Sequence, residues 1–326
     1  MGIAIPQVIT PSKATGAQVI DGSLRFDDDF KTSLSRSVST AGNRRTWTFS
    51  CWLKKSKLYS DSTYQNIFSS LNTGTIQFDT IDQLRIYDNA GGATREANSV
   101  SMRDTNGWYH IVVKFDTTQA TDTNRVFIYL NGEDISKKTG SWPSQNYESP
   151  FNAAQTHYLG TSSDSNNYLP GLLSQVYLID GQALGPEYFG FTDQLTNTWK
   201  PKKYTGTFGT NGFWLPMDGN SPIGQDQSGN GNDFTPIGFG GSKSPDKATG
   251  AKPILNTLPG GAHATVGVFG SRENVGYAVT VYNDGGGNKY YIDGVKQDTV
   301  TGLIRGATYT FDTSDSTVSS HPFRFS

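Results

Sequence analysis

The chain has 326 residues and a net charge of −2, and 34% of its residues are hydrophobic, 12% aromatic and 17% charged. A chain of this length can form two domains, and its few charges and many aromatic residues indicate an all-β protein rather than a helical enzyme or a disordered chain. The small net charge argues against electrostatic binding to nucleic acid or to an anionic membrane, so we expect neither partner.

Residues 1–20 form a predicted N-terminal arm that is rich in Pro, Ser, Thr and Ala. The arm lacks the basic region and long apolar stretch of a signal peptide, and no segment nears the roughly 18 consecutive apolar residues of a membrane-inserted helix. We expect its small apolar set to dock on a neighbouring subunit and to serve assembly rather than folding: Ile3, Ile5, Val8 and Ile9.

Strands are predicted from Leu24 onward. In Arg45–Leu53 (RTWTFSCWL), residues on one phase of a two-residue period are large or apolar, which is typical of a strand. The single cysteine, Cys51, lies in this strand, so the chain has no intrachain disulfide and suits a reducing cytoplasm. Similar patterns follow at Asn66–Ser70, Thr75–Asp79, Leu84–Tyr87, Trp108–Phe115, Val126–Leu130 and Leu173–Ile179.

Turn residues separate these strands. Asn131-Gly132 and Asp180-Gly181 are strong hairpin signals. Short strands joined in this way predict a two-sheet β-sandwich over residues 21–239. Residues 240–274, rich in Gly, Pro, Ser and Lys, then predict a linker.

Strand patterns resume beyond the linker at Tyr277–Tyr282, Lys289–Ile292 and Thr308–Asp312. We therefore expect a second, smaller β-sandwich domain over residues 275–326. The final residues HPFRFS still read as a strand, which predicts that this domain is incomplete at Ser326.

Several segments occur in an order that resembles the concanavalin A-like lectin/glucanase superfamily, of the laminin-G and pentraxin type, over residues 21–239. They read LRFDDDFKTSLSR, WTFSCWLKK, NGWYHIVVKFDT, RVFIYLNGEDI, LLSQVYLIDGQAL and DQSGNGNDFTP. The resemblance implies a jelly-roll sandwich of two antiparallel sheets, with ligands on the concave face or at the loop rim.

A narrower resemblance concerns YLIDGQALGPEYFG and WKPKKYTGTFGTNGFWLPMD, which are similar to modules of structural proteins from marine, especially cyanobacterial, bacteriophages. Residues 277–326 resemble a cupredoxin-like β-module of the same proteins. This resemblance implies a virion structural protein, made in the host cytoplasm, that belongs to a tail fibre or is tail-associated. Its implied partners are other virion proteins, a host surface glycan or receptor, and further copies of itself, a trimer by analogy with phage fibres.

Two alternatives stay open for the function. One is a head-decoration or knob protein on the capsid, and the other is a free glycan-binding lectin. A glycanase would need two carboxylates close together on one strand face, and the chain has no such strand pattern, so we expect no enzymatic activity. The histidines have neither an HExxH motif nor a neighbouring cysteine, so we expect no zinc or copper site.

Lectin-type members of the superfamily hold calcium with Asp- and Asn-rich loops, and calcium is the one cofactor left open. Calcium takes about six to eight oxygen ligands, but Asp and Asn are also ordinary turn formers, so a structural role is the alternative. The candidates are Asp164, Asn166 and Asn167 in one loop, and Asp226, Asn230, Asn232 and Asp233 in another.

Aromatic residues in or beside loops are candidates for stacking on sugars, with core packing as the alternative. The candidates for glycan binding are Trp142, Tyr147, Tyr168 and Trp199. Trp52 and Tyr158 share the same features. The lysines beside Trp199 (Lys200, Lys202 and Lys203) are interpreted as a solvated surface.

Overall fold

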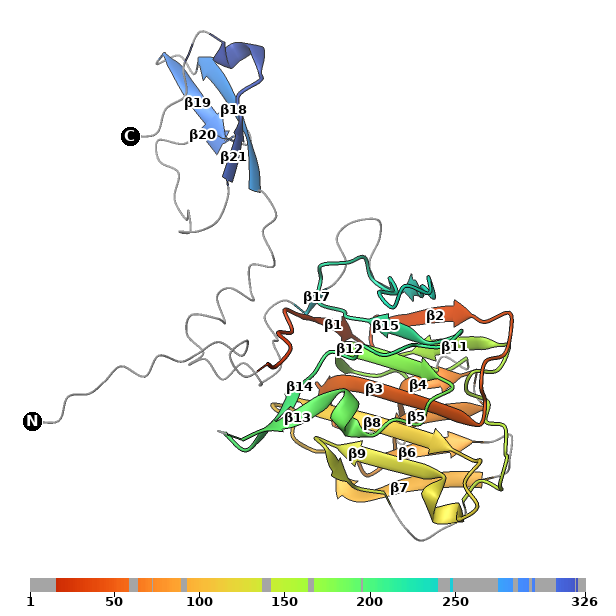
Figure 1. The fold of residues 1–326 in the computed structure, drawn as a ribbon. Helices are drawn as coiled ribbons and strands as arrows, with labels where there is room; N and C mark the ends of the chain where they lie inside the picture. The colour runs from red at the N-terminus through yellow and green to blue at the C-terminus, as the bar shows by residue number, and fades with distance from the viewer. Residues whose placement is uncertain are drawn as a thin grey trace, which may run out of the picture. The chain divides into compact units, whose positions relative to one another are not determined.

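The computed structural model divides into two units, Met1–Val268 and Phe269–Ser326. The structure describes residues 16–58, 64–71, 73–88, 93–136, 142–163, 167–194, 196–239, 247–248, 275–283, 287–292, 295–296, 309–319 and 321. Two large sheets, here called sheet A and sheet B, pack face to face in the first unit (Figure 1). They confirm the predicted all-β two-sheet sandwich.

Sheet A has eight strands. Seven follow the order β10–β9–β8–β3–β12–β1–β17, and β15 pairs with β12 off this path. The strands are β1 (Ser23–Phe26), β3 (Thr46–Lys55), β8 (Tyr109–Asp116), β9 (Val126–Leu130), β10 (Glu133–Asp134), β12 (Gly171–Asp180), β15 (Phe213–Leu215) and β17 (Lys247–Ala248). A bulge at Gln175, with φ of 49°, divides β12. Its first half pairs with β1 and its second half with β15.

Sheet B has seven strands in the order β16–β2–β11–β4–β5–β6–β7. They are β2 (Ser33–Ser37), β4 (Gln65–Ser70), β5 (Gly74–Phe78), β6 (Gln83–Asp88), β7 (Ala93–Ser101), β11 (Thr156–Leu159) and β16 (Thr235–Ile237). The main core lies between the sheets, with Trp47, Phe49 and Phe115 from sheet A against Phe68 and Phe78 from sheet B. The rings of Phe49 and Phe68 stack at 5.1 Å.

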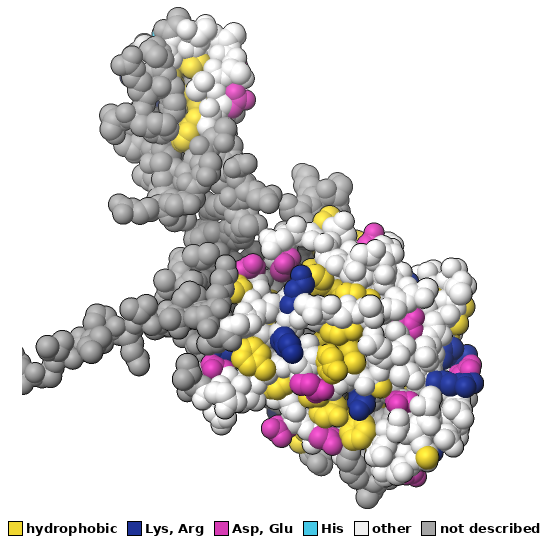
Figure 2. Space-filling view, viewed as in Figure 1, with side chains coloured by type: hydrophobic (Ala, Val, Ile, Leu, Met, Phe, Trp, Pro, Cys, Tyr) yellow, Lys and Arg dark blue, Asp and Glu magenta, His cyan; other side chains and the backbone are white. Residues whose placement is uncertain are grey.

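The outer face of sheet A is also apolar and is covered by the described part of residues 182–212. Two small elements lie in this covering segment, the 3-10 helix η3 (Pro186–Tyr188) and the hairpin β13 (Gly190–Asp193) with β14 (Thr198–Pro201). Phe189 and Tyr204 of the segment pack on Tyr177 and Ile179 of β12. Figure 2 looks onto this side and shows hydrophobic side chains over its middle, with charged side chains scattered around them.

A second cluster on the same side joins Ile20 to Trp52 and Trp108, with Trp199 packed against it. Gln18 donates from its backbone N–H to the Pro201 carbonyl at 2.9 Å. Packing of the sandwich therefore begins before the expected boundary at residue 21. The predicted assembly residues Ile3, Ile5, Val8 and Ile9 lie outside the described residues.

Most of the predicted linker also lies outside the described residues. Its one described part, β17, pairs with Ser23 and Leu24 at the edge of sheet A. This part of the linker thus belongs to the sandwich, because it pairs with an edge strand that would otherwise leave backbone groups unpaired.

The second unit contains β18 (Val275–Asn283), β19 (Asn288–Ile292), β20 (Val295–Lys296), β21 (Tyr309–Asp312) and the 3-10 helix η4 (Ser316–Val318). Its strands form one sheet in the order β20–β19–β18–β21. Val279 and Val281 are buried with Val318 of η4. The described residues of this unit give a single sheet backed by a short helix, and the small sandwich expected over residues 275–326 stays a prediction.

Two buried histidines make the fold sensitive to acid. Burial lowers the pKa of His110 to about 3 and that of His157 to about 4. Because these folded-state values lie below the ordinary value of about 6.5, the unfolded chain takes up protons first as the pH falls. Above about pH 6.5 the two histidines do not reduce the free energy of unfolding. Below about pH 6.5, each of them lowers the free energy of unfolding by up to about 1.4 kcal/mol per pH unit.

We predict that the free energy of unfolding of the first unit falls between about pH 6.5 and pH 4. The double substitution of His110 and His157 by Gln should lower stability at neutral pH but flatten this dependence. Urea titrations across the pH range test it, with His321→Gln in the second unit as the control. A double variant that keeps the full acid dependence would show that other groups cause it.

Candidate functional site

The outer face of sheet B presents a row of polar and aromatic residues that share one register position across its strands. Because residues directly opposite in a sheet point to the same side, the row lies on one face. Its alternating neighbours, such as Ile76 and Ile86, are in the core, so the row faces outward. From β2 to β6 the row reads Ser35, Tyr158, Ser69, Thr75 and Tyr87.

A second row runs parallel to the first, two residues further along the strands. It joins Asn66, Gln77 and Arg85, and the register continues to Glu96 on β7. A register shift in β4 between Asn66 and Phe68 brings Asn66 into this row. The bulge thus changes which residues of β4 stand beside β5 on this face.

Side chains of the second row are joined by hydrogen bonds. With its oxygen toward Arg85, the Gln77 amide accepts from Arg85 Nε at 2.7 Å and Nη2 at 2.9 Å. Its nitrogen donates to Asn66 Oδ1 at 2.8 Å and to Thr75 Oγ1 at 2.6 Å. Among the described residues, the buried Asn66 Nδ2 is left without a hydrogen-bond partner. An unpaired buried amide donor costs about 1–3 kcal/mol, and Asn66 itself is 0% exposed.

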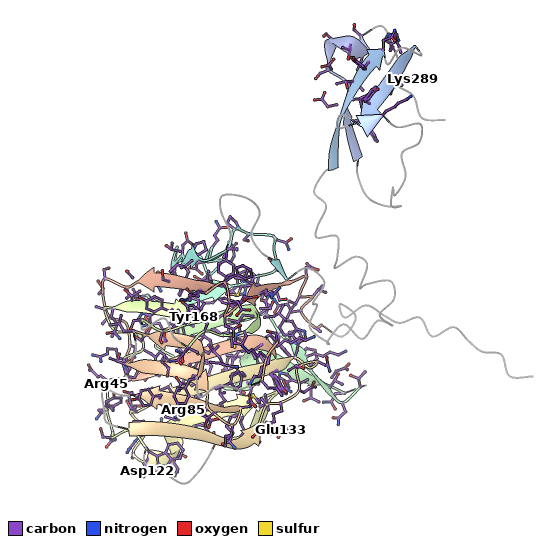
Figure 3. All side chains as sticks on the ribbon, turned by 180° about the vertical axis from the view of Figure 1, so that it is seen from behind. Arg45, Arg85, Asp122, Glu133, Tyr168 and Lys289 are labelled. Carbon is purple, nitrogen blue, oxygen red and sulfur yellow. The ribbon has the colours of Figure 1, made fainter. Side chains whose placement is uncertain are left out.

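Tyrosine rings flank this network. The Arg85 guanidinium lies 4.2 Å from the ring centre of Tyr64 and 5.2 Å from that of Tyr87, within cation–π range. Tyr168 follows Asn167, whose carbonyl accepts from the Asn66 backbone N–H at 3.1 Å. Figure 3 views the molecule from the side of sheet B, with Arg85 and Tyr168 labelled. The face thus combines half-exposed rings with a fixed guanidinium and amides.

The other predicted glycan-binding aromatics lie elsewhere. Trp199 is half-buried over sheet A, and its Nε1 donates to His110 Nδ1 at 2.9 Å. Trp52 is only 3% exposed and stacks on His110, so it is a packing residue. Trp142 and Tyr147 are half-buried against the main core. The structure does not gather the four predicted aromatics into one site.

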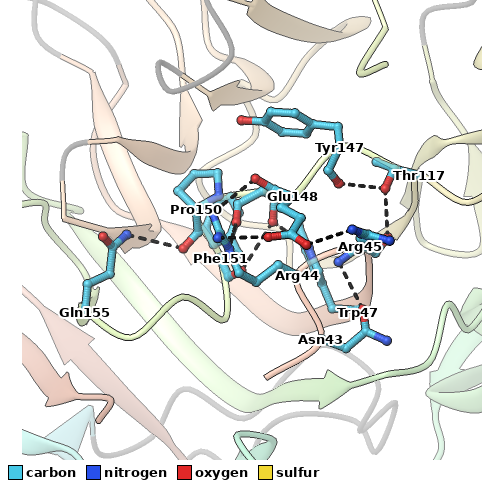
Figure 4. Close-up of polar contacts among 11 residues, drawn as sticks. Asn43, Arg44, Arg45, Trp47, Thr117, Tyr147, Glu148, Pro150, Phe151 and Gln155 are labelled. Atoms are coloured by element: carbon cyan, nitrogen blue, oxygen red, sulfur yellow. Dashed lines mark hydrogen bonds and ion pairs between the residues drawn. The ribbon is translucent and has the colours of Figure 1, made fainter. Parts of the chain in front are cut away.

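Polar contacts fix the segment that carries Tyr147 (Figure 4). Glu148 binds Arg44 at 3.2 Å and Arg45 at 2.9 Å. Thr117 Oγ1 donates to the Tyr147 carbonyl at 2.7 Å. The Tyr147 hydroxyl itself donates to Asp88 Oδ1 at 2.7 Å. These contacts tie the segment to both sheets, and they use the polar end of Tyr147 for structure.

Asp164 and Asn166 of the first predicted calcium loop lie outside the described residues. In the second loop the Asp226 carboxylate accepts from Trp214 N, Ser228 N, Ser228 Oγ and Asn232 N at 2.7–2.9 Å. Asp233 Oδ1 accepts from Asp226 N at 2.8 Å, and Asn230 Nδ2 donates to the carbonyls of Gly209 and Gly212. The geometry is that of a hydrogen-bonded turn, in which a cation would have to displace protein donors from Asp226.

Within the described part of the chain, Asp27, Asp28 and Asp29 are the one acidic group whose ligand atoms lie within 4.8 Å of one another. Asp27 Oδ1 accepts from the backbone N–H groups of Asp29 and Phe30, and Asp28 pairs with Lys57 at 2.9 Å. These carboxylates stabilise a turn. No helix among the described residues is long and apolar enough to span a membrane.

A family model described as the concanavalin A-like lectin/glucanases superfamily matches residues 27–187. One similar crystal structure is that of a Bacteroides ovatus protein to which carbohydrate binding has been assigned by inference. It is 17% identical to this chain, with a TM-score of 0.49. That match covers 73% of this chain and 63% of the other, less than two thirds of its length.

A heptameric SAP-like pentraxin from Limulus polyphemus is 15% identical with a TM-score of 0.41, over 74% of this chain and 99% of the other. Domains LG4-5 of the mouse laminin alpha1 chain are 11% identical with a TM-score of 0.35, over 58% of this chain and 47% of the other. The comparison with curated proteins found no match.

We predict that Asp226→Asn lowers the free energy of unfolding by about 1–3 kcal/mol, because one amide oxygen cannot replace two carboxylate oxygens that accept four hydrogen bonds. Urea unfolding in EDTA and in millimolar calcium should give the same loss. Asp218→Asn, in a half-buried turn, is the control and should cost less. Calcium that stabilises the wild type but not the Asp226 variant would instead make Asp226 a cation ligand.

Proposed function

The chain carries a concanavalin A-like lectin/glucanase (laminin G-like) domain, and we propose that this domain binds a glycan without cleaving it. The outer face of sheet B is the binding surface in this proposal. The observation that carries the proposal is the Arg85 guanidinium, which lies between the rings of Tyr64 and Tyr87 and is held by the buried Gln77 amide. Sugars offer hydroxyl oxygens to the N–H groups of such a guanidinium.

The first row supplies rings at a spacing that suits an oligosaccharide. Tyr158 on β11 and Tyr87 on β6 are three strands apart, which places them about 14 Å from each other. Between them lie Ser69 and Thr75, whose side chains are buried. Sugar rings can lie on the tyrosine faces at both ends, and their hydroxyl groups can accept from the Arg85 guanidinium beside Tyr87.

The proposal excludes glycan cleavage for a chemical reason. Glycoside hydrolysis normally uses two carboxylates on opposite sides of the scissile bond. Of the residues that the register places in the two rows, Glu96 is the one carboxylate. A ligand on this face would therefore meet donors and rings without an acid–nucleophile pair. The proposed binding also needs no metal ion, because its donors belong to side chains.

We further propose that the protein works in a bacteriophage virion, in a tail fibre or associated with the tail, where the glycan is a host-cell receptor. Support comes from the segments YLIDGQALGPEYFG and WKPKKYTGTFGTNGFWLPMD, which are similar to phage structural modules. In this setting the partners are other virion proteins, and the assembly is a homo-oligomer, with a trimer as the working model. A capsid decoration protein and a free lectin are the competing placements.

We predict that the full chain binds at least one glycan on an array and that Tyr87→Ala weakens this binding about 3- to 10-fold, the effect of losing one ring contact. Arg85→Ala should weaken it as well, because the Gln77 amide loses its two donors. Tyr188→Ala, a ring 44% exposed on the covering segment of sheet A, is the matched control and should bind normally. Binding should persist in EDTA.

Two results would contradict this proposal. Equal binding by the Tyr87, Arg85 and Tyr188 variants would place the site elsewhere. Release of reducing ends from the bound glycan above a heat-denatured control, abolished by a single carboxylate substitution, would make the protein an enzyme.

We predict that antibody labelling of purified virions marks the tail rather than the head. Labelling over the whole head surface would instead support the decoration protein. A protein absent from virions but active on the glycan array would be a free lectin.

A further inference from the structure

The sheet of the second unit has two chemically different sides. Val279 and Val281 of β18 are buried toward η4, and Tyr290 of β19 packs with them. Because side chains alternate along a strand, the residues between these lie on the opposite side. On that side Tyr282 is 65% exposed, which makes it one of the two most exposed large hydrophobic residues described in the chain.

The exposed side alternates tyrosine with lysine. Tyr282 stands directly opposite Lys289, and Tyr291 stands opposite Thr280 on one side and Lys296 on the other. The two tyrosine rings meet edge to face, with centres 5.8 Å apart and planes at 87°. This contact restrains the two rings, and the largely exposed Tyr282 lies beside Lys289.

The charge on this side is mainly positive. The register of β21 places Asp312 beside Ala278 on the same side, and its carboxylate accepts from the Ser314 backbone N–H at 2.9 Å. Among the described residues of this side, two lysines therefore outnumber one aspartate, which accepts within its own turn. Such a surface matches a ligand that brings both a stackable ring and a negative charge.

We propose that this surface, formed by Tyr282, Tyr291, Lys289 and Lys296, binds an acidic polysaccharide that carries uronate groups. A sugar ring lies on the Tyr282 face, and its acidic group lies between the lysines. The proposal does not depend on the function proposed for sheet B, because it concerns the second unit and an anionic ligand. It gives the second unit a binding role of its own.

The test measures binding of the full chain to immobilised alginate, a polyuronate, with uncharged dextran as the comparison. Alginate should bind, and binding should weaken as salt rises from about 50 mM to about 500 mM, where screening shortens the range of the lysine charges. Tyr282→Ala should lose about tenfold in affinity, and Tyr282→Phe, which keeps the ring, should bind nearly as the wild type. Lys289→Gln and Lys296→Gln should bind more weakly and with less salt dependence.

Matched controls come from the first unit. Tyr188→Ala and Lys202→Gln remove a surface ring and a surface cation there, and they should leave alginate binding unchanged. Arg85→Ala, which tests sheet B, should also leave it unchanged, so the two proposals fail separately. Failure to bind alginate, equal binding by the wild type and Tyr282→Ala, equal salt-insensitive binding of dextran, or equal losses in the controls would overturn the proposal.

Discussion

The sandwich depends on an asymmetry between its sheets, because sheet A is apolar on both faces and sheet B on one. All but one of the ten residues of β12 are buried, whereas buried and half-buried residues alternate along β6. A sheet with two apolar faces cannot leave either in water. The described part of residues 182–212 therefore returns over sheet A, and Tyr177 becomes the centre of a second aromatic cluster. The outer side of sheet B carries polar residues instead, and those of its central strands β4 and β5 are buried.

Polar side chains hold the loops that this arrangement creates. Lys55, at the end of β3 in sheet A, pairs at 2.6 Å with Asp82 in the β5–β6 turn of sheet B, and both are almost fully buried. Burial lowers the pKa of Lys55, while the Asp82 carboxylate opposes that shift. Such a pair adds little net stability but is costly to break, so it fixes one arrangement of the two sheets. At another loop, Asp180 accepts from the backbone N–H groups of Asn43 and Asn211.

The sequence predicted β3, β8, β9 and β12 of sheet A and β4, β5 and β6 of sheet B because alternation is a local signal, but it did not single out β2, β7 or β11. It did not predict the site, because that depends on register between strands far apart in the chain. Asn66 stands beside Gln77 only because of the bulge in β4. No local pattern in the sequence predicts that bulge. Local reasoning also left Trp52 as a candidate for sugar stacking with core packing as the alternative, and Ile20, Trp108 and the distant Trp199 pack around it. Asp226 shows the same limit, since its four donors come from residues 214, 228 and 232.

The binding face proposed on sheet B would differ from an enclosed pocket in the conformational entropy lost on binding and in the ligand surface it removes from water. Its rings and amides are held by neighbours before any ligand arrives, so little conformational entropy is lost on binding. The same face is shallow, because its tyrosines stay half-exposed, and it removes less of a ligand from water than an enclosed pocket would. Single sites of this kind bind weakly, and strong attachment then requires several copies that engage one polymer together. In a virion that displays several copies, weak contacts by each chain would combine into attachment that no single copy supplies.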